Sequence, residues 1–196
     1  APAQGIDLLD AIGSSLPLII TLIVLITFVI LLRTFRSVVL AIKAIILDLI
    51  SIAVSFAVLV LVFKFGFGTY QLEQLEAWVL VLLFAVLFGL SMDYEIFIVS
   101  RMREAWDRGA SNEEAIREGM RSSGAVVTAA ALIFITALTG LITGHFAGLQ
   151  QLGVGLAAGV LIDATIIRGL LLPSAMVLLG RWNWWMPGQG KTPSNT

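Results

Sequence analysis

The sequence predicts an all-α membrane protein: a bundle of five transmembrane helices, with a short cytoplasmic amphipathic helix between two of them. Hydrophobic residues make up 59% of the 196 residues and charged residues only 13%, whereas soluble domains carry about 25% charge. The mean hydropathy of +1.00 is correspondingly high. The chain contains no cysteine, which excludes disulfides and thiolate metal sites.

The apolar residues fall into five runs that follow one another along the chain. The predicted spans cover residues 16–32, 38–63, 78–100, 125–143 and 152–179. Each run reaches the roughly 17 to 25 residues that a spanning helix needs. The second and fifth exceed the thickness of a bilayer and are expected to tilt or protrude. Pro17 is expected in the first turn of the first span, where its missing N–H costs nothing.

The one long connection between spans is predicted to carry the amphipathic helix. Residues 111–114 have the pattern of a capping box, in which Ser111 and Glu114 satisfy each other's backbone N–H groups. A helix over 112–120 is expected to follow, with Ala115, Ile116 and Met120 on one face. This face is expected to pack beneath the bundle at the membrane surface, and a regulatory docking helix is the alternative.

Positive charge is distributed unequally over the connections. It flanks the first turnaround, fills the long connection and follows the last span, whereas Lys64 stands alone on the other side. The residues of the basic connections are Arg33, Arg36, Lys43, Arg101, Arg103, Arg108, Arg117, Arg121, Arg181 and Lys191. Cytoplasmic loops carry an excess of lysine and arginine. The N-terminus is therefore expected outside and the C-terminus in the cytoplasm, which agrees with five spans.

The third run contains Gly-Leu-Ser-Met-Asp-Tyr-Glu at residues 89–95. A charged side chain deep in a spanning helix costs roughly 3 kcal/mol or more, so it is a functional-site hypothesis by default. Asp93 and Tyr94 lie about 100° apart in helical projection, so both can border one interior seam, and Gly89 leaves room there for a neighbouring helix. A carboxyl group in such a place can exchange a proton near physiological pH. The pair is predicted to be a proton relay; a static hydrogen-bonded clasp between helices is the alternative.

Glu95 is predicted to form a structural ion pair with Arg168 of the fifth span, since it points away from Asp93. Asp163 and Arg168 are five residues apart and are expected on different faces of an α-helix, so they are not expected to pair. Asp163 is either a second titratable site or a hydrogen-bonded packing residue. Asp48 of the second span has the same two interpretations.

The remaining polar and small residues of the spans are expected to have structural roles. Thr128 is a candidate supporting group of the fourth span, although helical hydroxyls mostly bond to the preceding turn of their own helix. Gly153, Gly155 and Gly159 of the fifth span are predicted close-packing positions. They follow no strand, which excludes a nucleotide-binding glycine motif.

Several blocks of the chain together resemble one transporter family. They are residues 35–37, residues 89–95 with Ser100-Arg101, residues 127–131, 163–168 and 184–187. In this order they resemble the MmpL (mycobacterial membrane protein large) type of resistance–nodulation–division (RND) transporter, over almost the whole chain. The resemblance implies a proton-driven exporter of lipids or other hydrophobic molecules in the bacterial inner membrane. Protons would be the coupling ion, with no metal or other cofactor.

The resemblance also implies roles for parts of the chain. In that family two Asp–Tyr pairs, one from each pseudo-symmetric half, meet in the membrane domain, and Asp93 and Tyr94 match the C-terminal pair. Residues 16–187 would be the last five spans of a twelve-helix domain, 1–15 the end of an extracytoplasmic porter domain, and 188–196 a disordered tail. The expected partners are the bilayer, a hydrophobic substrate, and the missing N-terminal half or a partner copy with the opposing Asp–Tyr pair. The chain departs from the family pattern at two places: Asp48 stands where the family has asparagine, and the proline expected before Lys43 is missing.

Two other functions remain as alternatives. Asp93 and Asp163 lie on separate spans, as the dyad of an intramembrane aspartyl protease would, but the order Asp93-Tyr94 reverses the Tyr-Asp of presenilin-type enzymes. No catalytic residue and no nucleic-acid partner are therefore expected. A non-transporting scaffold or lipid-sensing bundle is the second alternative, and a matching Asp–Tyr span elsewhere in the protein would count against it.

Overall fold

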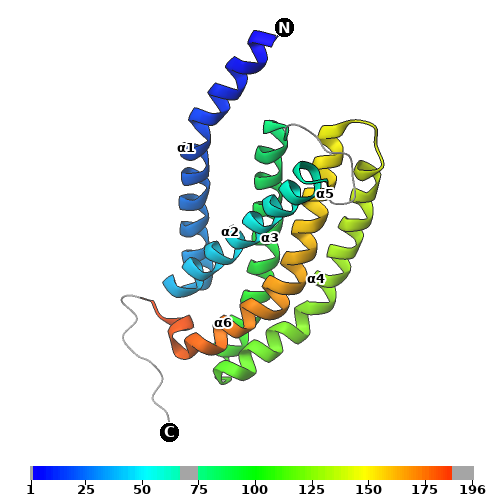
Figure 1. Cartoon of the computed structure of the whole chain (residues 1–196). Coiled ribbons are helices and arrows are strands. Elements are labelled where there is room, and N and C mark those ends of the chain that lie inside the picture. Colours follow the sequence, from blue (N-terminus) through cyan, green and yellow to red (C-terminus); the bar gives the residue numbers. More distant parts are fainter. Residues whose placement is uncertain (1, 67–74, 187–196) are drawn as a thin grey trace.

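The computed structural model describes residues 2–66 and 75–186, and every regular element in these two ranges is helical (Figure 1). The α-helices are α1 (Pro2–Phe35), α2 (Val38–Leu59), α3 (Ala77–Asp107), α4 (Asn112–Ile142), α5 (Ala147–Ile162) and α6 (Leu172–Leu179). Two π-helical segments, η1 (Val60–Lys64) and η2 (Asp163–Leu171), continue α2 and α5. A 3₁₀ segment, η3 (Gly180–Trp184), follows α6.

Five of these helical stretches are long and apolar enough to cross a membrane, which confirms the predicted five-span bundle. They are Pro17–Phe35, Val38–Lys64, Trp78–Asp107, Asn112–Ile142 and Ala147–Trp184. The chain is therefore a multi-pass membrane protein. The predicted tail at 188–196 lies outside the described residues.

The helices extend further than the apolar runs, and two predictions change as a result. α1 begins at Pro2, so Pro17 lies inside the helix and not in its first turn, and residues 2–16 extend this helix ahead of the stretch that can cross a membrane. The predicted helix at 112–120 forms, but it is the first part of α4 and not a separate element. Hydropathy marks only the lipid-contacting part of a helix, because polar residues extend a helix into water as readily as apolar ones do.

The start of α4 has the predicted cap. The backbone N–H of Ser111 donates to Oε2 of Glu114 at 2.9 Å, and the backbone N–H of Glu114 donates to Oγ of Ser111 at 3.3 Å. Ala115 and Ile116 are buried and Met120 is partly buried, as expected for the inner face of this helix. The capping box thus fixes where the fourth span begins.

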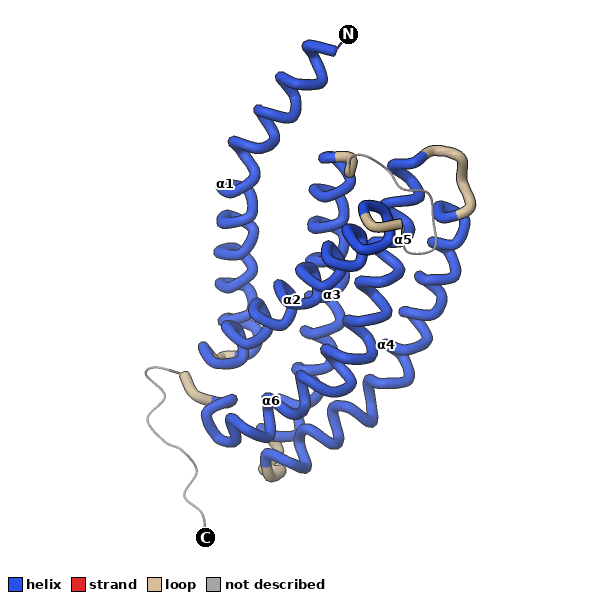
Figure 2. The backbone as a smooth tube through the Cα atoms, viewed as in Figure 1, coloured by secondary structure: helices blue, strands red, loops and turns tan. Residues whose placement is uncertain are grey.

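α5 is the central helix of the bundle, packed against α2, α3 and α4, while α1 lies at the edge against α2 and α3 (Figures 1 and 2). Glycine allows the close approach, as predicted. A Cβ on Gly155 would lie 2.1 Å from Cδ1 of Leu83, and one on Gly159 would lie 2.5 Å from Cδ1 of Leu87. A Cβ on Gly153 would also meet its neighbours closely. Small residues are a common means of packing helices tightly in membranes.

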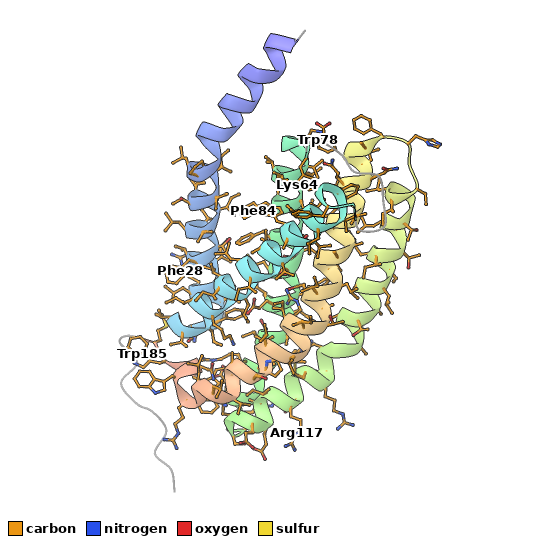
Figure 3. All side chains as sticks on the ribbon, in the orientation of Figure 1. Phe28, Lys64, Trp78, Phe84, Arg117 and Trp185 are labelled. Atoms are coloured by element: carbon orange, nitrogen blue, oxygen red, sulfur yellow. The ribbon has the colours of Figure 1, made fainter. Side chains whose placement is uncertain are left out.

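One end of the bundle gathers the connections that are rich in arginine, and we call it the basic end. Arg117 lies at this end and Lys64 at the other (Figure 3). Ser37 caps α2 by accepting from the N–H of Leu40, and its own hydroxyl donates to the carbonyl oxygen of Asn183 at 2.6 Å. The turn between α1 and α2 is thereby tied to the C-terminal segment.

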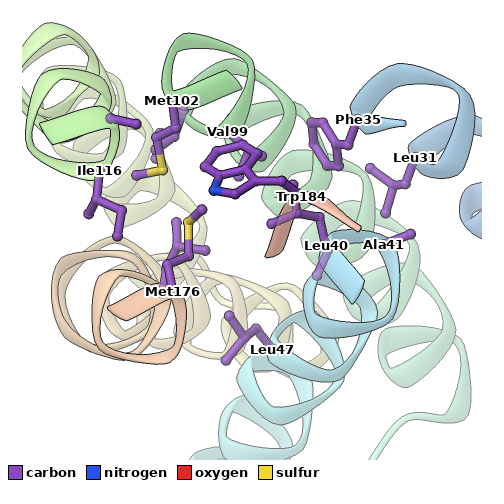
Figure 4. Close-up of a cluster of buried hydrophobic side chains, with 14 of the residues drawn as sticks. Leu31, Phe35, Leu40, Ala41, Leu47, Val99, Met102, Ile116, Met176 and Trp184 are labelled. Carbon is purple, nitrogen blue, oxygen red and sulfur yellow. The ribbon is translucent and has the colours of Figure 1, made fainter. Parts of the chain in front are cut away.

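An apolar cluster fills the basic end (Figure 4). Trp184 stacks on Trp106 with ring centroids 5.0 Å apart, and its indole N–H donates to Oδ1 of Asn112 at 3.0 Å. Met102 and Met176 are fully buried beside them. This packing holds α3, α4 and the end of the fifth span in register.

Candidate functional site

A buried polar cluster lies where α2, α3 and η2 meet. Its members are Lys43 and Asp48 of α2, Ser91 and Glu95 of α3, and Asp163 and Arg168 of η2. Each of these six residues is at most 8% exposed. Ionisable groups inside a transmembrane bundle are rare, and they mark ion pathways and proton relays.

Arg168 holds the cluster together. Its Nε donates to Oδ2 of Asp163 at 2.8 Å, in an ion pair with both side chains almost fully buried. Its Nη2 donates to Oγ of Ser91 at 2.7 Å and to the carbonyl oxygen of Ser91. The planar guanidinium suits several directed bonds at once, and here it joins the fifth span to α3.

The pairing of Asp163 with Arg168 contradicts the prediction that they lie on different faces. In an α-helix of 3.6 residues per turn, positions five apart are separated by roughly 140°. Residues 163–171 form a π-helix, in which each turn closes between residues five apart. The two side chains therefore share one face. Such π-helical turns occur frequently at functional sites.

The predicted ion pair between Glu95 and Arg168 is not formed. Glu95 is 3% exposed and close enough to Arg168 and Lys43 to interact electrostatically, but the guanidinium bonds to Asp163 and Ser91 instead. Oε1 of Glu95, Nζ of Lys43 and Nη1 of Arg168 have no hydrogen-bond partner among the described residues. Glu95 belongs to the cluster without a direct ionic contact in it.

Asp93 lies outside this cluster, on the exposed side of α3, so the prediction that it borders an interior seam of this bundle is wrong. It makes no hydrogen bond or ion pair with the residues that the structure describes. Gly89, one turn earlier, has no neighbouring atom within 4 Å of where its Cβ would be. Together with Leu82 and Phe97 these residues form an exposed stripe along α3 that no other helix in the described ranges covers.

Tyr94 connects the exposed stripe with the interior. It is half-buried, and Cζ of Arg168 lies 5.6 Å from the centroid of its ring. A guanidinium at this distance from an aromatic face is attracted by the ring quadrupole. The residue beside Asp93 thus contacts the cation that holds Asp163 and Ser91.

Thr128 is exposed on α4 and makes no hydrogen bond to the cluster. Two other hydroxyls of the same helix bond back along it, as expected: Thr136 donates to the carbonyl oxygen of Leu132 at 2.7 Å, and Thr139 donates to that of Thr136 at 2.6 Å. The fourth span therefore adds no side chain to the buried cluster.

Sequence reasoning did not identify Ser91 and Lys43 as members of the site. Ser91 is one helical turn before Glu95, and this spacing alone would have placed both on one face. The position of Lys43 near the first turnaround predicts a place at the cytoplasmic surface, but the residue is only 8% exposed. The apolar residues on both sides of Lys43 in the sequence could have indicated that it lies inside the bundle. Within residues 2–66 and 75–186, no group of three histidine, aspartate or glutamate side chains is placed to hold a metal ion.

Comparison with known proteins shows the family of the chain. The MMPL family model matches residues 1–195. The chain is 37% identical over 185 residues to the mycolic acid-containing lipids exporter MmpL11 of Mycolicibacterium smegmatis, covering 92% of this chain and 19% of that protein. It is 38% identical over 190 residues to the trehalose monomycolate exporter MmpL3 of Mycobacterium tuberculosis, covering 95% and 20%.

A third relative, the heme uptake protein MmpL11 of M. tuberculosis, is 36% identical over 185 residues, covering 92% of this chain and 19% of that protein. The chain thus spans about a fifth of the length of these relatives. The matched region includes the third span with Asp93 and the fifth span with Arg168. The resemblance found in the sequence is confirmed, and the chain belongs to the MMPL family.

Proposed function

We propose that the chain is part of the membrane domain of a proton-driven exporter of lipids or other hydrophobic molecules. The observation that carries this proposal is the buried ionisable cluster at the meeting of three spans, in contact through Tyr94 with the segment that bears Asp93. Two relatives are named as lipid exporters. A third is named for heme uptake.

In this proposal Asp93 and Tyr94 form half of a proton relay. The exposed stripe of α3, with open space at Gly89, is where the other half of the membrane domain or a partner copy supplies the opposing Asp–Tyr pair. Docking there would remove Asp93 from lipid. Such contact satisfies the requirement that an intramembrane carboxylate face protein or water.

Proton binding would change the forces acting on the cluster. A neutral Asp93 no longer attracts cations near Tyr94, so the balance among Tyr94, Arg168 and the incoming helix changes. A ligand shifts a two-state equilibrium only through its different affinity for the two states. The available driving force is about 2.3 kcal/mol per charge for a potential of about 100 mV, and about 1.4 kcal/mol for each tenfold proton gradient.

The charge distribution supports an orientation in which the basic end of the bundle would face the cytoplasm, with the N-terminus outside. Membership of the MMPL family supports a location in a bacterial inner membrane. Protons would be the coupling ion. A non-transporting scaffold or lipid-sensing bundle would have no use for five buried ionisable groups, whose burial is costly.

Transport by the whole protein in proteoliposomes tests the proposal. Asp93→Asn keeps the shape of the side chain but cannot exchange a proton, and it is expected to abolish transport driven by an imposed pH gradient while membrane insertion is retained. Glu113→Gln, an exposed carboxyl at the start of α4, is the matched control and is expected to transport normally. Normal gradient-driven transport by Asp93→Asn would refute the relay.

A further inference from the structure

Ser91 lies between two carboxyl groups from different spans. Its Oγ is 3.0 Å from Oδ1 of Asp163 and is also within hydrogen-bond distance of Oδ1 of Asp48. In addition it accepts a hydrogen bond from Nη2 of Arg168 at 2.7 Å. All four residues are buried, so no bulk water competes for these contacts.

The number of protons available at Ser91 constrains the two carboxyl groups. A serine hydroxyl has one proton to donate, and an ionised carboxylate has none. Ser91 can therefore donate to only one of Asp48 and Asp163. The other contact is a hydrogen bond only if the second carboxyl group carries a proton and donates it to Oγ. With both carboxylates ionised, two oxygens with lone pairs would face each other in a buried site.

The other contacts of each carboxyl group show which one carries the proton. Asp163 accepts from Nε of Arg168 at 2.8 Å through Oδ2, so it is the ionised member and its Oδ1 accepts from Ser91. Asp48 has no cation in contact within the described residues, and its Oδ2 has no hydrogen-bond partner there. A buried ionised carboxylate with a bare oxygen is costly, whereas the neutral acid is much less so.

The charges around Asp48 agree with this assignment. Glu95 of α3 and Asp163 of η2 repel a negative charge on Asp48, and Arg168 of η2 attracts it. Lys43 lies on the same helix, with its Nζ unpartnered among the described residues. The described spans of α1 (17–32) and α5 contain no charged residue, and Arg181 of η3 is exposed. Two buried cations thus face three buried carboxyl groups, and one proton makes the cluster neutral.

We propose that Asp48, Ser91 and Asp163 form a proton-binding site within the bundle, with the proton resident on Asp48. The site lies on the buried side of α3, whereas Asp93 lies on the exposed side of the same helix. Its occupancy does not depend on transport, while its use in coupling rests on the proposed function. Ser91 makes the site a relay between α2 and η2, because its hydroxyl can accept from one carboxyl group and donate to the other.

Transfer along the relay conserves protons. The Asp48 O–H bond breaks as its proton moves to Oγ of Ser91, and the original Ser91 O–H bond breaks as that proton moves to Oδ1 of Asp163. The products are an ionised Asp48, an intact serine hydroxyl and a neutral Asp163. Neutralising Asp163 weakens its hold on Arg168, the same guanidinium that lies against the ring of Tyr94.

Infrared difference spectroscopy of the whole protein in lipid vesicles tests the occupancy. A carboxylic acid has a C=O stretching band that a carboxylate lacks. At neutral pH the parent protein is expected to show this band, Asp48→Asn to lose that contribution, and the surface control Glu113→Gln to keep it. An unchanged acid band in Asp48→Asn would overturn the proposal.

A second measurement distinguishes Asp48 from Asp163 through thermal unfolding in detergent. The amide introduced by Asp48→Asn retains an N–H donor toward Ser91, as the neutral acid has an O–H donor, so this variant is expected to unfold close to the temperature of the parent. Asp163→Asn deprives Arg168 of its counter-charge and is expected to unfold at a clearly lower temperature. The reverse order would place the proton on Asp163 and overturn the proposal.

The outcomes separate this site from the transport function. Loss of the acid band in Asp48→Asn, together with transport that is indifferent to a pH gradient, would support the site and contradict the proton-driven exporter. Gradient-driven transport, together with an acid band that Asp48→Asn leaves unchanged, would support the proton-driven exporter and contradict the site.

Discussion

Asp163 and Arg168 are five residues apart in sequence and form a 2.8 Å ion pair on one face of a π-helix. Both side chains are almost completely buried, so the pair has little screening from solvent. The same guanidinium bonds to Ser91 and lies against Tyr94. The π-helical backbone of the fifth span thus places Arg168 where this one cation joins the third span to the fifth.

Removing one member of this buried pair should lower the free energy of unfolding far more than removing one member of an exposed pair. Arg168→Met leaves Asp163 buried without its counter-charge, and breaking a buried pair in this way costs about 3–5 kcal/mol. The double variant Asp163→Leu with Arg168→Met should be less destabilised than the sum of the single changes. Thermal unfolding in detergent measures both effects.

The matched control is Arg101 with Glu104, which are 3.0 Å apart and about half exposed. Exposed pairs contribute about 0–1 kcal/mol, so Arg101→Met should change the unfolding temperature little. Equal losses at the two arginines would show that the pair of the fifth span is not buried in the membrane-embedded protein.

Close packing of α5 should depend on Gly155. In Gly155→Ala the added Cβ would meet the side chains of Leu83 and Leu59, and overpacking of this kind costs about 1–3 kcal/mol. Gly140→Ala is the control, because nothing lies within 4 Å of its Cβ position and alanine favours the helix by about 0.5–1 kcal/mol. Unfolding temperatures that move in the same direction for both would contradict the packing described for α5.

The open stripe of α3 should be occupied in the whole transporter. Gly89→Leu adds bulk where this chain has empty space, so it should leave the five-helix bundle folded but impair transport. Gly140→Leu adds the same bulk to an open position of α4 and should have a smaller effect. Equal transport by both variants would place the second half elsewhere. Transport normalised to the amount of folded protein provides the comparison.

Tyr94 should act mainly through its ring. Tyr94→Phe keeps the aromatic face beside Arg168 and should impair transport less than Asp93→Asn does. Tyr94→Leu removes that face and should impair transport more than Tyr94→Phe. If phenylalanine and leucine give the same loss, the hydroxyl group and not the ring is the operative part.

Much of the architecture could be predicted from residue patterns. The five apolar runs located the spans, and the capping box located the start of α4, because both signals are local. The glycines of α5 indicated close helix contact without revealing which leucines they would meet. The helix ends were missed, since hydropathy does not record where a helix continues into water.

The site was only partly predictable, for two physical reasons. The separation of Asp163 from Arg168 followed from assuming α-helical geometry, and a π-helical segment reverses that conclusion. Positive charge near a helix end usually indicates the cytoplasmic surface, so the sequence predicts Lys43 at a turnaround. The fold buries its side chain instead. Which polar residues meet depends on helix rotation, and neighbouring helices set that rotation.

Proton flux that accompanies substrate movement tests the account most directly. The whole protein is reconstituted in vesicles containing a pH-sensitive dye, and substrate is then supplied without an imposed gradient. The parent protein should move protons as substrate is transported, and Asp93→Asn should move neither, although it inserts into the membrane to the same extent. Substrate transport by the parent protein without proton flux, or an undiminished flux in Asp93→Asn, would contradict proton coupling through this site.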